Sequence, residues 1–103
     1  MRMAKVYNFG EYAGNLVEIE KPDKYKFIYY EKYEGPAVSL TMPKIKKEYE
    51  YKKFPPFFEG LLPEGMQLEA LIRQTKTDRN DLFSQLILVG KDLVGSVTVE
   101  GAE

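Results

Sequence analysis

Residues 54–65 read FPPFFEGLLPEG, and this stretch separates two parts of the chain whose apolar residues follow different periods. Before it, apolar and polar residues tend to alternate, as they do in strands. After it, apolar residues recur every three or four positions, as they do in helices. The sequence therefore predicts an α+β fold with most of its strands in the N-terminal half.

The opening of the chain predicts a β-hairpin. Residues 3–9 and 15–20 are short stretches of residues that favour strands. Residues 10–14 lie between them and contain two glycines, which suit a turn. We therefore expect the turn of this hairpin to span residues 10–14.

Three further segments predict strands of the same sheet. Residues 24–33 alternate with period two, so that one face carries aromatic side chains. These aromatic residues are Tyr25, Phe27, Tyr29 and Tyr33. Residues 37–41 predict a short strand, and residues 47–52 predict a half-exposed one with tyrosines on one face and charges on the other. Together the segments predict a small, twisted, mainly antiparallel sheet.

The second half predicts two to three helices packed on that sheet. Residues 57–62 follow two prolines and predict a short helical turn. A longer helix is expected from Pro63, with one apolar stripe laid on the sheet. The members of this stripe are Leu68, Leu71, Ile72 and Thr75.

A last helix and a closing strand complete the predicted fold. The helix is expected to begin at a cap formed by Thr77 or Asp78 and to end at Gly90. Its apolar stripe consists of Leu82, Phe83, Leu86 and Ile87. Residues 93–99 are rich in β-branched side chains and predict a strand that places Leu93, Val97 and Val99 on one face.

Length and composition favour one domain over residues 1–103 and narrow its chemistry. The 103 residues are 44% hydrophobic, which is enough for one core. The 15 basic and 16 acidic residues nearly cancel, so no long-range field favours nucleic acid. The chain has no cysteine and no histidine, and so lacks the commonest metal ligands and the usual neutral-pH base. We expect no cofactor and no metal site.

The expected location is the cytoplasm. The N-terminus has no apolar region typical of a signal peptide, and no stretch approaches the roughly 20 apolar residues of a membrane span. The absence of cysteine agrees with a reducing compartment. No interaction with a membrane is expected.

Other motifs suggest chemistry only weakly. The aromatic and basic residues of segment 24–33 could stack on the bases of single-stranded nucleic acid, but aromatic residues at strand period usually face a core. The carboxylate pairs Glu59 with Glu64 and Asp78 with Asp81 could supply an acid and a base. Asp78 and Asp81 are more simply explained by the preference for negative charge at the start of a helix. We therefore expect neither catalysis nor direct binding of nucleic acid.

The stretch at residues 54–65 carries more apolar side chains than a surface connection normally does, so it is either a core plug or an interface. Its motifs resemble the N-terminal domain of HipA-family kinases, in which Phe-Phe, Leu-Leu-Pro-Glu-Gly, two helices and a Gly-x-Val-x-Val-like strand follow one another. The motifs that match lie at residues 57–58, 61–65, 81–83 and 94–99. The resemblance implies the fold of that domain.

The resemblance also implies a function. A full-length family member continues into ATP-binding and catalytic parts, whereas these 103 residues contain no catalytic-loop or metal-binding aspartate set. The chain looks like the small subunit of split systems of the HipBST type. This implies an antitoxin that inhibits a separately encoded HipA-like (HipT-type) serine/threonine kinase. A helix-turn-helix DNA-binding protein of the HipB type would be the third component.

The predicted partner-binding residues lie on the short helical turn and the loop after it. They are Phe57, Phe58, Leu61, Leu62, Pro63, Glu64, Gly65 and Met66. The segment from Gly60 to Met66 is expected to face the cleft of the kinase. Phe57, Phe58 and Leu61 could instead only fill the core. Met66 is the sharper prediction, because methionine adapts to irregular pockets.

Two other functions remain open at this point. The chain could be the N-terminal subdomain of a fused HipA-type kinase, excised from it. It could also be an adaptor that binds nucleic acid through the aromatic and basic segment from Lys24 to Lys53, although its balanced charge disfavours this.

Overall fold

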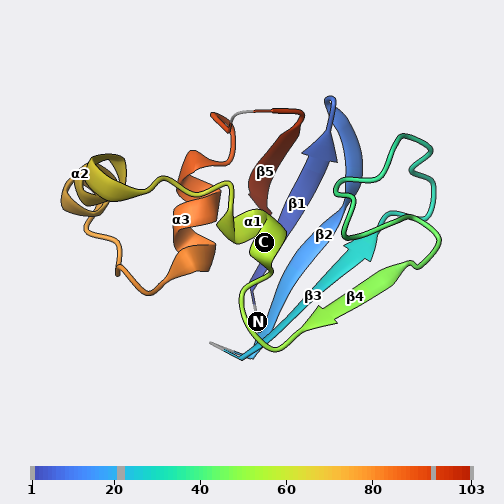
Figure 1. Cartoon of the computed structure of the whole chain (residues 1–103), viewed down its shortest axis with the longest axis horizontal. Coiled ribbons are helices and arrows are strands. Elements are labelled where there is room, and N and C mark those ends of the chain that lie inside the picture. The colour runs from blue at the N-terminus through green and yellow to red at the C-terminus, as the bar shows by residue number, and fades with distance from the viewer. Residues whose placement is uncertain (1, 21–22, 94, 103) are drawn as a thin grey trace.

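The computed structural model describes residues 2–20, 23–93 and 95–102, and it is α+β as predicted (Figure 1). Within these ranges, five antiparallel strands form one sheet in the order β4-β3-β2-β1-β5. The elements are β1 (Arg2–Asn8), β2 (Glu11–Glu20), β3 (Lys24–Tyr29), β4 (Glu48–Tyr51), α1 (Pro56–Glu59), α2 (Gly65–Thr75), α3 (Leu82–Val89) and β5 (Val97–Ala102). Among the described residues, no helix is both long and apolar enough to cross a bilayer.

The opening hairpin is confirmed, but its turn is shorter than expected. β1 and β2 are joined by Phe9 and Gly10 alone, and both have positive φ angles, 52° and 81°. Two such residues make the turn that best matches the twist of a hairpin. Gly14 belongs to β2 instead of the turn. A side chain there would overlap the carbonyl oxygen of Ile28 on β3.

The core lies between the sheet and the helices α1 and α3. The aromatic residues of segment 24–33 point into it as predicted, although β3 ends at Tyr29. Tyr33 is buried beyond the end of the strand, where its hydroxyl donates to the carbonyl oxygen of Pro36 at 2.6 Å. The largest completely buried apolar side chains are Phe27, Phe58, Phe83, Leu16 and Met42. Since the aromatic stripe is buried, it offers no platform for stacking bases.

The segment between β3 and β4, residues 30–47, has no strand, so the strand predicted over residues 37–41 was wrong. Instead of hydrogen bonds to a neighbouring strand, this segment makes hydrogen bonds with the Tyr29 hydroxyl. The backbone N–H of Val38 donates to this hydroxyl at 3.0 Å, and the hydroxyl donates to the carbonyl oxygen of Met42 at 2.5 Å. Both Val38 and Met42 are buried. We refer to residues 30–47 as the β3–β4 loop.

The start of α3 differs from the prediction by a few residues. The N-cap is Asp81, whose carboxylate accepts a hydrogen bond from the backbone N–H of Ser84 at 3.2 Å. The predicted cap Asp78 instead accepts from the N–H of Asn80 at 2.8 Å within the preceding turn. Two aspartates three residues apart offer the same capping signal, and only the position of the helix decides between them.

The end of α3 is at Gly90, as predicted. A side chain on Gly90 would overlap the carbonyl oxygen of Val99, because the two backbones meet where the N–H of Val99 donates to the Gly90 oxygen at 2.9 Å. The closing strand begins at Val97, later than expected, so Leu93 lies in the connection before it. Val94 lies outside the described residues.

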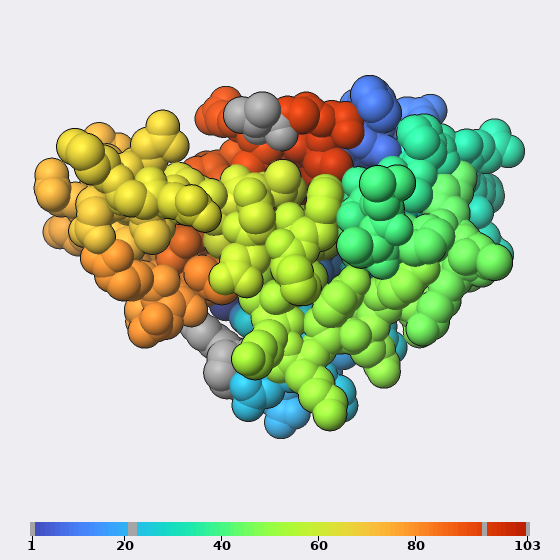
Figure 2. All heavy atoms as spheres, in the orientation of Figure 1, coloured from blue at the N-terminus to red at the C-terminus, as the bar shows by residue number. Residues whose placement is uncertain are grey.

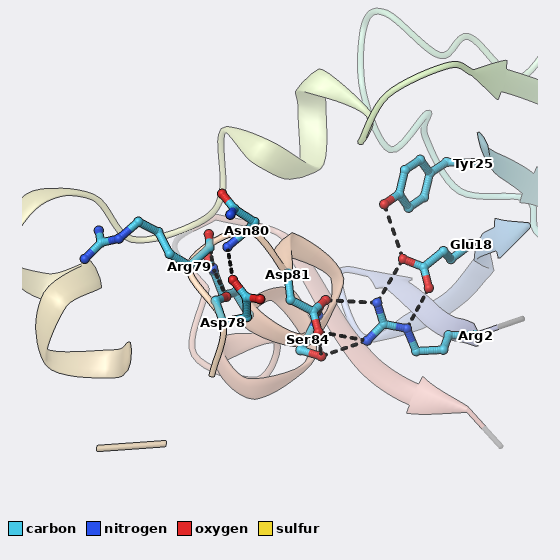
Figure 3. A network of polar contacts seen from close by, with 9 residues as sticks. Arg2, Glu18, Tyr25, Asp78, Arg79, Asn80, Asp81 and Ser84 are labelled. Carbon is cyan, nitrogen blue, oxygen red and sulfur yellow. Dashed lines mark hydrogen bonds and ion pairs between the residues drawn. The ribbon is translucent and has the colours of Figure 1, made fainter. Parts of the chain in front are cut away.

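Arg2 ties the first three strands and α3 together (Figure 3). Its guanidinium donates to both oxygens of Glu18 on β2, at 2.7 and 2.8 Å. It also donates to Asp81 at 2.9 Å and to the hydroxyl of Ser84 at 2.8 Å. The Tyr25 hydroxyl on β3 donates to Glu18 at 3.2 Å. One guanidinium thus makes charge-assisted hydrogen bonds to two carboxylates in this half-buried network.

The network shifts the pKa values of its members. Burial raises the pKa of the Asp81 carboxyl, but hydrogen bonds from Arg2 and Ser84 outweigh burial and hold this pKa well below its usual range. Hydrogen bonds to Glu18 and Asp81 raise the pKa of the Arg2 guanidinium. Burial, together with the nearby Glu18 charge, raises the pKa of Tyr25 to about 12. All three groups therefore keep their ordinary charge around neutral pH.

The helix α2 lies apart from the sheet, contrary to the prediction that its apolar stripe packs on it. No residue of α2 is buried, and Figure 1 shows α2 beyond α3 at one end of the molecule. Leu68, Leu71 and Ile72 are only half-buried. The period of a helix reveals which side chains share a face but not what that face contacts.

Candidate partner-binding surface

The predicted partner-binding residues lie on α1, on the connection after it and on the first turn of α2. Tight backbone hydrogen bonds continue from α1 into the connection: the N–H of Leu61 donates to Phe58, and that of Leu62 donates to Glu59, both at 3.1 Å. The connection is therefore a compact structure and not an open loop. Pro63 near its end restricts the backbone further.

Two of the predicted residues face inward. Phe58 is completely buried, and its ring lies 5.8 Å from that of Phe27 on β3. Leu62 is also buried in the core. Packing explains both residues, so they support the surface from beneath. A direct contact of either with a partner stays a prediction.

The other predicted residues reach the surface to different degrees. Met66 is 89% exposed on the first turn of α2. Glu64 and Gly65 beside it are exposed, whereas Leu61 and Pro63 are half-buried. Phe57 is half-buried too, and its ring packs edge-on against Phe58 at 5.1 Å. The structure thus places an exposed methionine next to partly exposed apolar residues.

A hollow of about 400 Å³ opens beside these residues. One wall is formed by the connection after α1 together with Gln67 of α2, and the other by the end of α3 and the residues after it. The lining residues are Gly60, Leu61, Leu62, Pro63, Gln67, Val89, Asp92 and Leu93. Sequence reasoning missed the second wall, because it assigned Leu93 to a strand. In the sequence, the only indication of this second wall was an apolar residue, Leu93, shortly after the Gly90 that ends α3.

The orientation of α2 depends on few contacts. Left-handed residues bound it, with φ of 57° at Gly65 and 58° at Lys76. An ion pair joins Glu69 of α2 to Arg79 in the next turn at 2.7 Å, and the hydrogen bond from Arg79 lowers the pKa of the Glu69 carboxyl. Both side chains are about half exposed, so this pair holds α2 only weakly.

The members of the carboxylate pairs singled out in the sequence are either engaged in local hydrogen bonds or exposed. Asp81 is engaged by Arg2 and Ser84, and Asp78 shapes the preceding turn. Glu59 and Glu64 are exposed. Among the residues that the structure describes, no group of acidic side chains is arranged to hold a metal ion.

The sequence pattern of the family described as "HipA N-terminal domain" matches residues 4–100, nearly the whole chain. The chain belongs to this family. A solved structure described as "N-terminal domain of HipA toxin" is similar to this HipA N-terminal domain, with a TM-score of 0.77 and 25% identity over all of this chain and 94% of the other. The sequence resemblance is therefore confirmed.

A curated relative of this HipA N-terminal domain comes from Haemophilus influenzae and is described as an uncharacterized protein. It is 28% identical over 100 residues, which cover 97% of this chain and 92% of the relative. That relative is therefore also little longer than one such domain.

Proposed function

We propose that this HipA N-terminal domain is an antitoxin that binds a separately encoded HipA-like serine/threonine kinase and inhibits it. The observation that carries the proposal is the family match over residues 4–100, together with a relative of nearly the same length. The alignment covers 92% of the Haemophilus influenzae relative, and a protein of that length would need a partner for the surface that a fused kinase covers. The third component would be a DNA-binding protein of the HipB type.

The contact with the kinase is proposed to centre on Met66. Its side chain is almost fully exposed on α2, which projects from the body. Exposed apolar side chains at the centre of an interface usually carry most of its binding energy. Leu61 and Pro63 would add apolar area around it, and Phe58 and Leu62 would keep the connection rigid from within. A rigid connection loses little entropy on binding.

A second candidate function is that of the N-terminal part of a fused kinase. The similar solved structure, described as a domain of the HipA toxin, favours it. The Gly60–Met66 segment would then pack against the kinase lobe of the same polypeptide. The same residues would be buried in both cases, so only the genetic arrangement and the binding partner separate the two functions.

The test is co-expression with the HipA-like kinase encoded beside this chain, followed by co-purification and a growth assay. The expected result is a stable complex and restored growth. Met66→Asp should weaken inhibition at least about tenfold, because it places a charge in an apolar contact. It should leave the fold unchanged, since Met66 packs against little in the free domain.

Phe9→Asp is the matched control. Phe9 is 71% exposed in the β1–β2 turn, on neither the connection nor α2. The same gain of charge there should leave binding and rescue unchanged. Full inhibition by Met66→Asp would refute the proposed contact, while the absence of both complex and rescue with the unmodified chain would refute the antitoxin function.

A further inference from the structure

The β3–β4 loop displays two aliphatic side chains almost completely to solvent. Leu40 is 99% exposed and Ile45 is 92% exposed. Single exposed aliphatic residues are ordinary on protein surfaces. Here two of them, more exposed than any other large apolar side chain among the described residues, occur in one loop.

Turn geometry does not require them. The N–H of Met42 donates to the carbonyl oxygen of Ser39 at 3.0 Å, so Leu40 is a central residue of a β-turn. The N–H of Lys46 donates to Pro43 at 3.4 Å, and Ile45 is a central residue of that second turn. Such positions favour glycine, asparagine, aspartate and serine. Leucine and isoleucine therefore bring no local advantage.

The loop is also ordered without them. The Tyr29 hydroxyl joins Val38 to Met42, as described above. The Tyr33 hydroxyl accepts a hydrogen bond from the side-chain amide of Asn8 on β1 at 3.0 Å. These buried contacts fix the loop against the sheet. The side chains of Leu40 and Ile45 thus extend from an ordered loop whose buried contacts do not involve them.

Basic residues outnumber acidic ones in the β3–β4 loop, with Lys32, Lys44, Lys46 and Lys47 against Glu31 and Glu34. Residues 35–47 contain three lysines and no acidic residue. The ammonium group of Lys44 lies 4.9 Å from the ring centre of Tyr33, and that of Lys46 lies 5.3 Å from the ring centre of Tyr49. Aromatic faces hold both lysines in place without cancelling their charge. Lys47 pairs with Glu31, but both side chains are largely exposed.

We propose that the β3–β4 loop is a second interaction surface, which binds an acidic protein surface. Leu40 and Ile45 would enter apolar pockets of the partner, and Lys44 and Lys46 would meet carboxylates around them. The loop lies at the opposite end of the molecule from α2, as Figures 1 and 2 show. The surface is thus separate from the one proposed to bind the kinase.

The experiment is a titration followed by the methyl NMR signals of Leu40 and Ile45. The probe is a synthetic amphipathic helical peptide with leucines on one face and glutamates on the other. Its matched control has lysine in place of every glutamate. Vesicles of phosphatidylglycerol test the alternative of an anionic membrane.

The expected result is a shift of both methyl signals with the acidic peptide, weakened by salt, and none with the lysine peptide. The double variant Leu40→Ser/Ile45→Asn should bind the acidic peptide at least about tenfold more weakly and melt at an unchanged temperature. Phe9→Asp should bind like the unmodified chain. No shift with the acidic peptide, equal binding of the two peptides, or binding to the vesicles alone would overturn the proposal.

Discussion

Arginine usually lies at the protein surface, but the side chain of Arg2 joins β1 to β2 and to the start of α3. We refer to these contacts as the Arg2 clamp. The Arg2 guanidinium contacts Glu18 and Asp81, and it also lies 4.9 Å from the ring centre of Phe83. Sequence reasoning did not single out Arg2, because its partners lie 16 and 79 positions away. No local pattern connects residues at such separations. Only the sheet order and the placement of α3 bring them together.

Replacing Arg2 with methionine should destabilise the domain by about 2–3 kcal/mol, because buried Glu18 would lose its hydrogen bonds from the guanidinium. Urea denaturation measures this change in the free energy of unfolding. Lys5→Met is the control, since Lys5 is an exposed cation on the same strand. We expect the control to change stability by less than about 0.5 kcal/mol. Equal effects of the two substitutions would show that the clamp does not matter.

Acid should weaken the same clamp. The pKa of Asp81 is lower in the folded chain than its unfolded value near 4, so folding favours the ionised form. The resulting stability is present above about pH 5 and is lost as the pH falls towards 2. The free energy of unfolding should therefore differ most between the unmodified chain and Asp81→Asn at pH 7, and this difference should shrink in acid. A difference that is constant with pH would contradict the prediction.

At the scale of elements, α2 is the least constrained. It contributes no buried residue, and left-handed residues bound it at Gly65 and Lys76. Segments with few buried contacts open locally at a small free-energy cost. Its stability therefore differs from that of the central strands, which are paired on both sides.

Amide hydrogen exchange should reveal this difference. In the free domain, we expect the amides of α2 to exchange at least about a hundredfold faster than those of β2, which lies inside the sheet. Binding of the proposed kinase should slow the exchange of α2 selectively, and β2 serves as the internal control. Equal protection of α2 and β2 in the free domain would contradict the prediction.

The sequence predicted those elements whose partners are close along the chain. The opening hairpin, the aromatic face of β3, the tyrosine face of β4 and the end of α3 at Gly90 all follow from local patterns. The predictions were wrong where contacts with residues distant in the sequence determine the local structure. Residues 37–41 form turns because the buried Tyr29 hydroxyl binds their backbone, and the α2 stripe lies away from the sheet.

The sequence indicated only part of the candidate surface, because the rest depends on contacts between residues that are distant in the chain. The motif around residues 61–65 indicated the region, and the exposure of Met66 is as expected. The sequence could not separate Phe58, which is buried, from the half-buried Phe57, because adjacent phenylalanines carry the same signal. The hollow depends on residues after α3 that only the fold brings near.

At the scale of the whole molecule, the domain is elongated, 39 × 27 × 25 Å. The two proposed surfaces lie at the ends of the long axis, α2 at one and the β3–β4 loop at the other (Figure 2). The sheet and its core separate them. The two ends can therefore be contacted by different proteins, and the domain is suited to join them.

The two proposed surfaces should act independently. We expect the kinase and the acidic peptide to bind at once, with each affinity changed less than about twofold by the other partner, because distant sites are usually additive. Analytical ultracentrifugation with a labelled peptide measures both. Met66→Asp should weaken only kinase binding, and Leu40→Ser/Ile45→Asn only peptide binding. Competition between kinase and peptide would show that they share a surface.

The loose attachment of α2 also has a consequence for the lifetime of the chain. A protease needs an extended backbone segment, and such segments form most readily where local opening costs little. A cut between Gly65 and Lys76 would break α2, and Met66 would then lie at or near a frayed chain end. Turnover of the free domain would then begin by disrupting the segment proposed to bind the kinase, and a bound kinase would protect that segment from cleavage.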